Sequence, residues 1–251
     1  MSKLRSRLLK KYGIIALIML SHLGCVKSTE EAESSEKYNF GELSALAHGK
    51  TDKSMEYHGF TEIYEHIFFP LKDLRIKIFE IGIAKGGSLF LWQDYFTNAT
   101  IYGIDIYEKS VKGRRIKTFI ADQTDRNQLQ SFIDKYGSDY AIILDDGGHQ
   151  MEMQQISFGF LFRHVKPGGY YIIEDVHTSL PNYYPSYAPK DQENSTLRMF
   201  NNFIENSVIK SKYLKPEEIE YLNNNIEYCN LFFRNNGPHS ITCIFKKSLN
   251  D

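Results

Sequence analysis

An apolar run that ends in a glycine-rich turn is the feature that most constrains how this chain of 251 residues can fold. The run covers residues 76–81, and Gly82, Gly86 and Gly87 follow it before apolar residues recur at helical spacing. This order predicts a strand, a tight turn and a helix. Glycines let the backbone approach a ligand closely, and a helix N-terminus attracts negative groups. We expect a nucleotide-like cofactor here, with a ligand-free turn as the alternative.

Composition narrows the class of partner. The chain is 42% hydrophobic, enough to bury the core of one α/β domain with extensions. Its net charge of −1 argues against a nucleic-acid partner and favours a small substrate. The three cysteines, Cys25, Cys229 and Cys243, share no metal-ligand spacing and suggest a reducing compartment.

The N-terminal region has a different composition from the rest. Residues 1–12 are rich in Lys and Arg, and residues 13–25 are mostly apolar, as in a secretion signal. The apolar run is shorter than the roughly 20 residues that cross a bilayer. A lipid-modified Cys25, a helix on the inner membrane face and a helix packed on the domain are the alternatives. The Ser- and Glu-rich residues 26–37 predict a linker, so the domain is expected to cover residues 38–251.

Two further predicted strands end in residues that suit a nucleoside. The strand predicted at residues 100–106 contains Asp105, where doubly wound folds place an acid that binds ribose hydroxyls. A helix cap or turn is the alternative role for Asp105. After the strand predicted at 116–120, Asp122 and Gln123 could bind an adenine edge or cap the helix predicted at 126–136. The sequence leaves that choice open.

Acidic residues follow the next two predicted strands, at residues 140–144 and 170–173. The carboxyl ends of parallel strands meet at one edge of a sheet, so these side chains should converge beside the cofactor. Carboxylates so close repel unless protons or a cation intervene, and a cluster of oxygen ligands suits magnesium. The alternative has Asp145 or Asp146 capping a helix and Glu174 facing solvent. The side chains expected to converge are Asp146, His149, Glu174 and Asp175.

The two ends of the predicted domain complete the architecture. Residues 38–71 have helical spacing around a polar loop, which could bind a ligand but is equally explained by caps and turns. Residues 180–195 form a long tyrosine-rich loop, as expected of a lid. Helices are predicted at 196–211 and 216–222. A terminal hairpin of residues 226–233 and 240–245 would add antiparallel edge strands.

Together these motifs resemble one family. The chain from about 38 to 246 is similar to the metal-dependent class I S-adenosylmethionine (SAM) sugar O-methyltransferases, which include macrocin, mycinamicin and aminocoumarin-noviose methyltransferases. Two departures are Gly148, where the family commonly has Ser, and Lys50, which interrupts the usual Gly-Thr-Asp-Lys. The motifs that carry the resemblance are Gly49–Lys53, His58–Thr61, Glu80–Ser88, Gly103–Asp105, Asp122–Gln123, Asp145–His149 and Ile173–Ser179.

The resemblance implies a Rossmann-like fold, with a central, mostly parallel seven-stranded sheet, helices on both faces and a C-terminal antiparallel hairpin. It implies SAM as cofactor and a divalent cation such as Mg²⁺ held by Asp146, Glu174 and Asp175. His149, as the base, and Asp146 are the expected catalytic residues. The expected cofactor-binding residues are Glu80, Gly82, Gly86, Ser88, Asp105, Asp122, Gln123 and Asp145.

The predicted function is transfer of a methyl group to a sugar hydroxyl of a glycoside or polysaccharide precursor. A metal-dependent methyltransferase of catechols or phenols and a non-catalytic SAM-binding accessory protein are the alternatives. The glycine spacing and the terminal hairpin disfavour a nicotinamide-dependent oxidoreductase. We expect a sugar-containing acceptor, no nucleic acid, a cytoplasmic location where SAM is available, and, as further alternatives, a homo-oligomer and contact of residues 1–25 with the inner membrane face.

Overall fold

The computed structural model describes residues 41–181, 186–187, 192–234 and 240–250. Residues 39–251 form one compact unit. The segments predicted at 1–25 and 26–37, and much of the predicted lid, lie outside the described residues. No helix among the described residues is long and apolar enough to cross a membrane.

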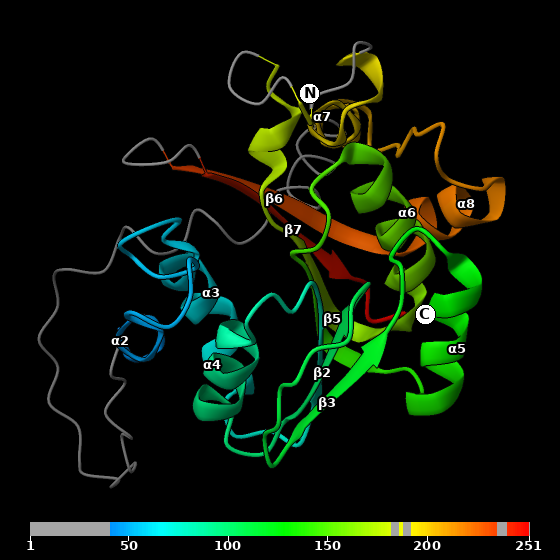
Figure 1. The fold of residues 1–251 in the computed structure, drawn as a ribbon. Helices are drawn as coiled ribbons and strands as arrows, with labels where there is room; N and C mark the ends of the chain where they lie inside the picture. Colours follow the sequence, from blue (N-terminus) through cyan, green and yellow to red (C-terminus); the bar gives the residue numbers. More distant parts are fainter. Residues whose placement is uncertain (1–40, 182–185, 188–191, 235–239, 251) are drawn as a thin grey trace, which may run out of the picture. The chain divides into compact units, whose positions relative to one another are not determined.

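A seven-stranded sheet runs through the centre of this unit, in the order β3-β2-β1-β4-β5-β7-β6 (Figure 1). The first five strands pair in parallel, while β7 pairs antiparallel with both β5 and β6. The predicted parallel sheet with a C-terminal antiparallel hairpin is therefore confirmed. The strands are β1 Lys77–Ile81, β2 Thr100–Asp105, β3 Ile116–Ile120, β4 Tyr140–Asp145, β5 Val165–Ile173, β6 Ile226–Arg234 and β7 Ser240–Lys247.

Helices cover both faces of the sheet (Figure 1). On one face lie α2 Glu42–Ala47, α3 Phe60–Phe68 and α4 Gly87–Tyr95. On the other lie α5 Arg126–Tyr136, α6 Met151–Leu161, α7 Thr196–Asn206 and α8 Pro216–Asn225. Short 3₁₀ helices occur at Phe69–Leu71, Phe162–His164, Val176–Ser179 and Gln192–Asn194.

Two apolar cores result, because successive side chains of a strand point to opposite faces. On β1, Phe79 packs in the core under α5 and α6, whereas Ile78 packs in the core under α3 and α4. Every residue of β4 is buried, as expected of a central parallel strand with both faces covered. The sheet is thus held on both sides, which fixes the positions of its strand ends.

Some predicted boundaries differ from those in the structure. The helix predicted at 196–211 ends at Asn206, because Ser207 adopts a left-handed conformation and Asn223 Oδ1 accepts the Ile209 amide. The strand predicted at 170–173 begins earlier in the structure, because β5 starts at Val165. These ends depend on contacts with distant residues and not on local pattern.

We predict that Phe158→Ala destabilises the fold by about 3–5 kcal/mol, since it removes a fully buried ring and leaves a cavity. The Phe158 ring stacks on Phe245, with ring centroids 4.5 Å apart, and thereby joins α6 to β7. The free energy of unfolding in urea tests this prediction. Ile204→Ala, at a position 55% exposed on α7, should change it by less than about 0.5 kcal/mol. Equal effects of the two changes would contradict this account of the core.

Candidate active site

Backbone hydrogen bonds bring the predicted site residues to one level of the sheet. The amide of Gly82 donates to Ile104 O, the amide of Asp146 donates to Ile81 O, and the amide of Glu174 donates to Asp145 O. These bonds continue the pairing of β1, β4 and β5 with a neighbouring strand by one residue past the end of each of the three. The glycine turn and the acidic residues therefore meet at the carboxyl edge, as the sequence predicted.

The turn after β1 is closely packed. Gly82 has a φ of +87°, and a Cβ there would lie 2.0 Å from the backbone oxygen of Asp146. Gly86, with a φ of +83°, is the N-cap of α4. Ala84 also has a positive φ, of 43°, an uncommon conformation for a residue with a side chain. Such a local conformation is found at functional sites more often than elsewhere.

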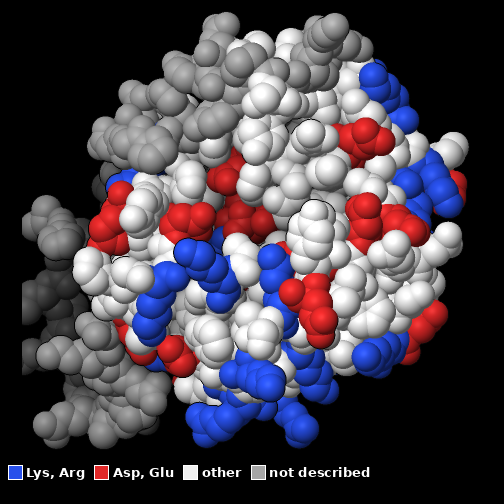
Figure 2. Space-filling model, viewed as in Figure 1, with Lys and Arg blue, Asp and Glu red and all other residues white. Residues whose placement is uncertain are grey.

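Two cavities open at this edge of the sheet, with volumes of about 420 and 470 Å³. The first lies between the turn and the loop that joins α2 to α3, and the second extends toward the ends of β2 and β3. Both are lined by Asp52, Gly82, Ala84 and Asp146. Figure 2 shows acidic side chains gathered near the middle of one face, with Lys and Arg side chains directly below them.

Most of the predicted cofactor-binding residues border these cavities. Gly82 and Ser88 line the first cavity. Asp105 and Asp122 line the second, and Gln123 and the proposed base His149 also border it. Asp105 additionally accepts the amides of Ile83 and Tyr107, at 3.0 Å each, so it shapes the turn as well as facing the cavity.

Glu80, Gly86 and Asp145 line neither cavity. Glu80 is fully buried and accepts a hydrogen bond from Trp92 Nε1 on α4. Asp145 points toward α6 and accepts hydrogen bonds from Ser157 on that helix and from Gln123 after β3. Burial raises the pKa of Glu80 to about 7 and that of Asp145 to about 6. Both acids are buried beside the cavities, and their contact with the cofactor stays a prediction.

Gln123 and Asp122 both line the second cavity, and neither caps α5. The Gln123 side chain donates to Asp145, and its Oε1 accepts the Gly148 amide at 2.6 Å, so both ends of its amide are engaged. The cap of α5 is Asp125, and Asp122 instead accepts the amide and hydroxyl of Thr124. Gln123 therefore braces the loop after β4, while Asp122 remains at the cavity wall.

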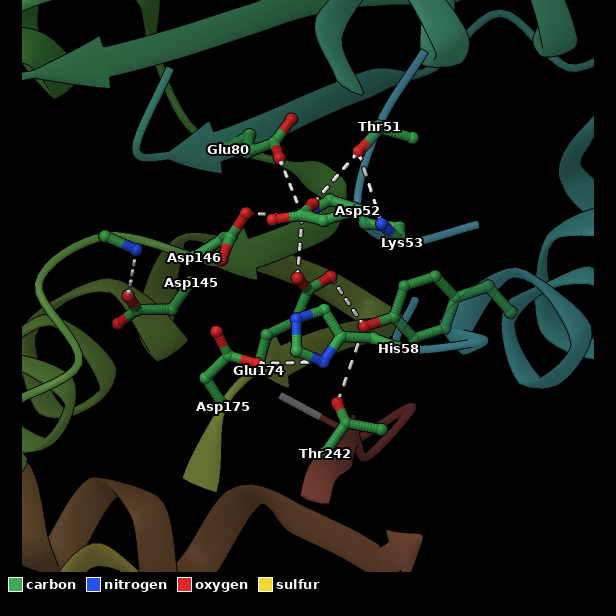
Figure 3. Close-up of polar contacts among 12 residues, drawn as sticks. Thr51, Asp52, Lys53, His58, Glu80, Asp145, Asp146, Glu174, Asp175 and Thr242 are labelled. Carbon is green, nitrogen blue, oxygen red and sulfur yellow. Dashed lines mark hydrogen bonds and ion pairs between the residues drawn. The ribbon is translucent and has the colours of Figure 1, made fainter. Parts of the chain in front are cut away.

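A buried lysine occupies the centre of the acidic cluster (Figure 3). Lys53 Nζ lies 2.5 Å from Asp146 Oδ2, 2.6 Å from Glu174 Oε2 and 3.4 Å from Glu80 Oε1. Burial alone lowers the pKa of Lys53, but the three carboxylates raise it well above its usual value. The lysine is therefore an ammonium ion. The other oxygen of Glu174 accepts from the Tyr64 hydroxyl at 2.7 Å.

Asp146, His149 and Asp175 form a group that could hold a metal ion, with one ligand atom from each within 4.8 Å of the others. His149 Nε2 lies 3.5 Å from Asp175 Oδ2. Asp175 Oδ1 is buried and accepts no hydrogen bond from the described residues. Burial and the charge of Asp146 raise the pKa of Asp175. Asp175 also has a left-handed backbone, with a φ of 55°.

The chemistry of these donors fits a hard divalent cation. Two carboxylates supply oxygen ligands, and the Asp175 oxygen that accepts no hydrogen bond from the described residues has a lone pair available. Glu174, the third predicted ligand, is outside this group, and Lys53 and Tyr64 each donate to one of its oxygens. Each carboxylate oxygen has two lone pairs, so these bonds do not exhaust its capacity.

Sequence reasoning gave no role to several residues that complete the site. Lys53 and Tyr64 hold Glu174, and Asp52 borders both cavities. His58 Nδ1 contacts Ser240 Oγ at 2.7 Å and lies 3.9 Å from Asp175 Oδ1. The density of polar residues between 48 and 61 was the available signal, but caps and turns explained it equally well.

Comparison with known proteins identifies similar chains. No family model matches. The chain is 34% identical over 183 residues to mycinamicin VI 2''-O-methyltransferase of Micromonospora griseorubida, covering 68% of this chain and 44% of that protein. It is 38% identical over 146 residues to demethylmacrocin O-methyltransferase of Streptomyces fradiae, covering 55% of this chain and 36% of that protein. The matched region thus spans less than half of either relative.

Comparison with solved structures points to the same group of proteins. MycE methyltransferase, from the mycinamycin biosynthetic pathway and in complex with Mg, SAH and mycinamycin VI, has a TM-score of 0.67 and 30% identity to this chain. That match covers 86% of this chain and 56% of MycE. The fold is therefore the class I methyltransferase fold. These matches confirm that the chain resembles the sugar O-methyltransferase family, over a region that corresponds to about half the length of its members.

Proposed function

We propose that this chain is a SAM- and divalent-metal-dependent O-methyltransferase that methylates a sugar hydroxyl of a glycoside or polysaccharide precursor. One observation carries the proposal: Asp146 lines both cavities at the glycine turn and also belongs to the candidate metal group. A methyl donor in those cavities and a hydroxyl held at the metal group would meet at this residue. The names of the similar proteins support the same activity.

The residues around the glycine turn would hold SAM, which supplies a methyl group on a positively charged sulfur. Gly87 and Ser88, which begin α4, line the first cavity and suit the amino-acid carboxylate, because a helix N-terminus attracts negative charge. Asp105 and Asp122 line the second cavity and offer oxygens to a nucleoside. The similarity to MycE, whose solved structure is a complex with SAH, supports this assignment.

Asp146 and Asp175 would hold the metal, with Glu174 as the third ligand. A divalent cation there would lower the pKa of a bound hydroxyl by acting as a Lewis acid. The buried oxygen of Asp175 that lacks a hydrogen-bond donor among the described residues supports this role. Lys53 and Tyr64 would orient Glu174 through the bonds they already donate to it.

We assign His149 the role of base. Its Nε2 lies 3.5 Å from Asp175 Oδ2, which would favour the tautomer that carries its proton on Nε2. Nδ1 then has the lone pair that would accept the hydroxyl proton. The imidazole belongs to the candidate metal group as well, so its two roles need separate measurements.

Acceptor profiling tests the proposal. The purified chain would be incubated with SAM, Mg²⁺ and panels of glycosides, polysaccharide precursors and catechols, and methylation would be followed by mass spectrometry. Methylated sugars are expected. Methylation of phenols alone would overturn the sugar assignment. Binding of S-adenosylhomocysteine (SAH), the demethylated product, without turnover on any acceptor would instead favour an accessory protein.

Location and assembly are part of the proposal as well. We propose a cytoplasmic enzyme, because SAM is available there, with contact of residues 1–25 at the inner membrane face. Those residues have the basic and apolar composition that suits a membrane surface. Cell fractionation of the full chain and of a chain that lacks residues 1–25 tests the membrane contact, and light scattering tests a homo-oligomer.

Gly82→Ala should weaken SAH binding by about tenfold or more. The new Cβ would lie 2.0 Å from Asp146 O, so the loops after β1 and β4 must separate. Calorimetric titration of SAH measures the effect. Gly41→Ala is the matched control, because Gly41 has a φ of +104° but a Cβ there meets no atom within 4 Å. Unchanged binding in Gly82→Ala would contradict the cofactor assignment.

His149→Ala should lower kcat by about 10²–10⁴, the usual contribution of a general base, with little change in SAH affinity. Single-turnover kinetics and SAH titration measure the two effects. Mg²⁺ titration of the same variant separates the two roles of His149. Retained Mg²⁺ affinity agrees with a base, whereas loss of Mg²⁺ binding would identify a ligand.

Removing divalent metal should reduce methyl transfer to background, and adding Mg²⁺ back should restore it. The physical reason is that a sugar hydroxyl is a poor nucleophile until its pKa is lowered. Activity is measured before chelation, after chelation and after adding Mg²⁺ back. Asp175→Asn should require more Mg²⁺ for half-maximal activity. Full activity in metal-free buffer would exclude the metal role.

A further inference from the structure

Lys53 connects three chain segments that are far apart in sequence. Its ammonium contacts Glu80 on β1, Asp146 after β4 and Glu174 after β5 (Figure 3). The Lys53 side chain is 1% exposed, and those of Glu80 and Glu174 are 0% and 2% exposed. Breaking such a buried ion pair is costly, because the remaining charges have no compensation.

Lys53 also belongs to the loop of residues 48–59, which joins α2 to α3 and forms one wall of the first cavity. Residues 49–52 line that cavity. The loop packs tightly on the start of α4, where a Cβ on Gly87 would lie 2.1 Å from Lys50 O. Within the loop, the amide of His58 donates to Asp52 O, and the amide of Thr61 on α3 donates to Lys53 O. A shift of Lys53 would therefore move the cavity wall.

We propose that Lys53 is a positioning residue whose ammonium ties the 48–59 loop to Glu80, Asp146 and Glu174, and thereby holds the cofactor cavity and the candidate metal ligands in one arrangement. This inference rests on the proposed function for the identity of the ligands. The contacts of Lys53 with the three acids and the loop do not depend on which ligands bind. Lys53 would touch neither reacting atom and would act through the carboxylates and the loop.

Charge and packing can be separated by substitution and chemical rescue. Lys53→Ala removes the three terminal carbons and the ammonium, a fragment that corresponds to propylammonium. Lys53→Met keeps most of the stem length and removes the ammonium, so it is available if Lys53→Ala does not fold. Added propylammonium can replace the missing cation, whereas propanol has a similar size and no charge.

Two quantities would be measured on the full chain, the melting temperature and the dissociation constant of SAH. Both variants should melt about 10 °C lower than the wild type, as expected for a broken buried ion pair in a domain of this size. They should bind SAH about tenfold more weakly. For Lys53→Ala, propylammonium should restore much of both properties, and propanol should restore neither.

Lys247→Ala is the matched control. Lys247 is also buried, but its Nζ donates to the carbonyls of Arg163 and Val165, at the amino end of β5, far from the site. This variant should melt at a lower temperature while it binds SAH with unchanged affinity.

Each outcome bears on the proposal in a defined way. If the Lys53 variants melt at a lower temperature but bind SAH as tightly as the wild type, Lys53 stabilises the fold without positioning the cofactor cavity. That result would overturn the proposal. Equal rescue by propanol would overturn the role of charge. If the wild type does not bind SAH, the proposed function is contradicted. The melting temperature of Lys53→Ala with and without propylammonium would then be the test of whether Lys53 ties the loop to the carboxylates.

Discussion

The parallel alignment of β1, β4 and β5 is the constraint on which the rest of the site depends. Ile81 pairs with Asp145, and Asp145 pairs with Ile173, so the three strands end at the same level. The next residue of each strand is then Gly82, Asp146 or Glu174, and a backbone hydrogen bond fixes each of them. Main-chain geometry therefore brings the acidic residues together before any side-chain contact forms.

That alignment creates an electrostatic problem, because it buries carboxylates in a low dielectric. Ionised groups taken out of water must be paired or must bind a proton. Here Lys53 reaches in from a loop more than 20 positions before β1, and Tyr64 on α3 donates to Glu174. The loop of residues 48–59 thus supplies the positive charge that the acids at the strand ends need. A movement of the loop would also move that charge.

Much of the fold could be predicted because its signals are local. The apolar run of β4, the glycine turn after β1 and the hairpin of β6 and β7 each show in a short window of sequence. Convergence of the acidic residues followed from a general rule for parallel sheets. These predictions require only the order of the strands and the spacing of residues along the chain.

The roles of individual polar residues could not be read in the same way. Glu80 stays a predicted cofactor-binding residue, but the sequence did not show that it lies on a face of β1 covered by α4, where Trp92 donates to it. Strand alternation decides which face a side chain takes, and an acid one residue before a strand end is directed into the core. The contacts of Gln123 and Lys53 could not be predicted for a related reason, because their partners lie 22 or more positions away in the sequence.

The number of acids in the site suggests how it would treat its ligands. Lys53 brings one ammonium to three acidic side chains, and Asp175 adds a fourth acid within the candidate metal group. Burial raises the pKa of Glu80, Glu174 and Asp175, and a bound cation would favour their ionised forms. The cluster therefore favours positive ligands, which the cation and the sulfonium of SAM both are. Methyl transfer to an oxyanion removes the sulfonium charge, so the acids would attract the demethylated product less than the donor. If the proposed function holds, the carboxylates that assemble the site would also favour release of its product.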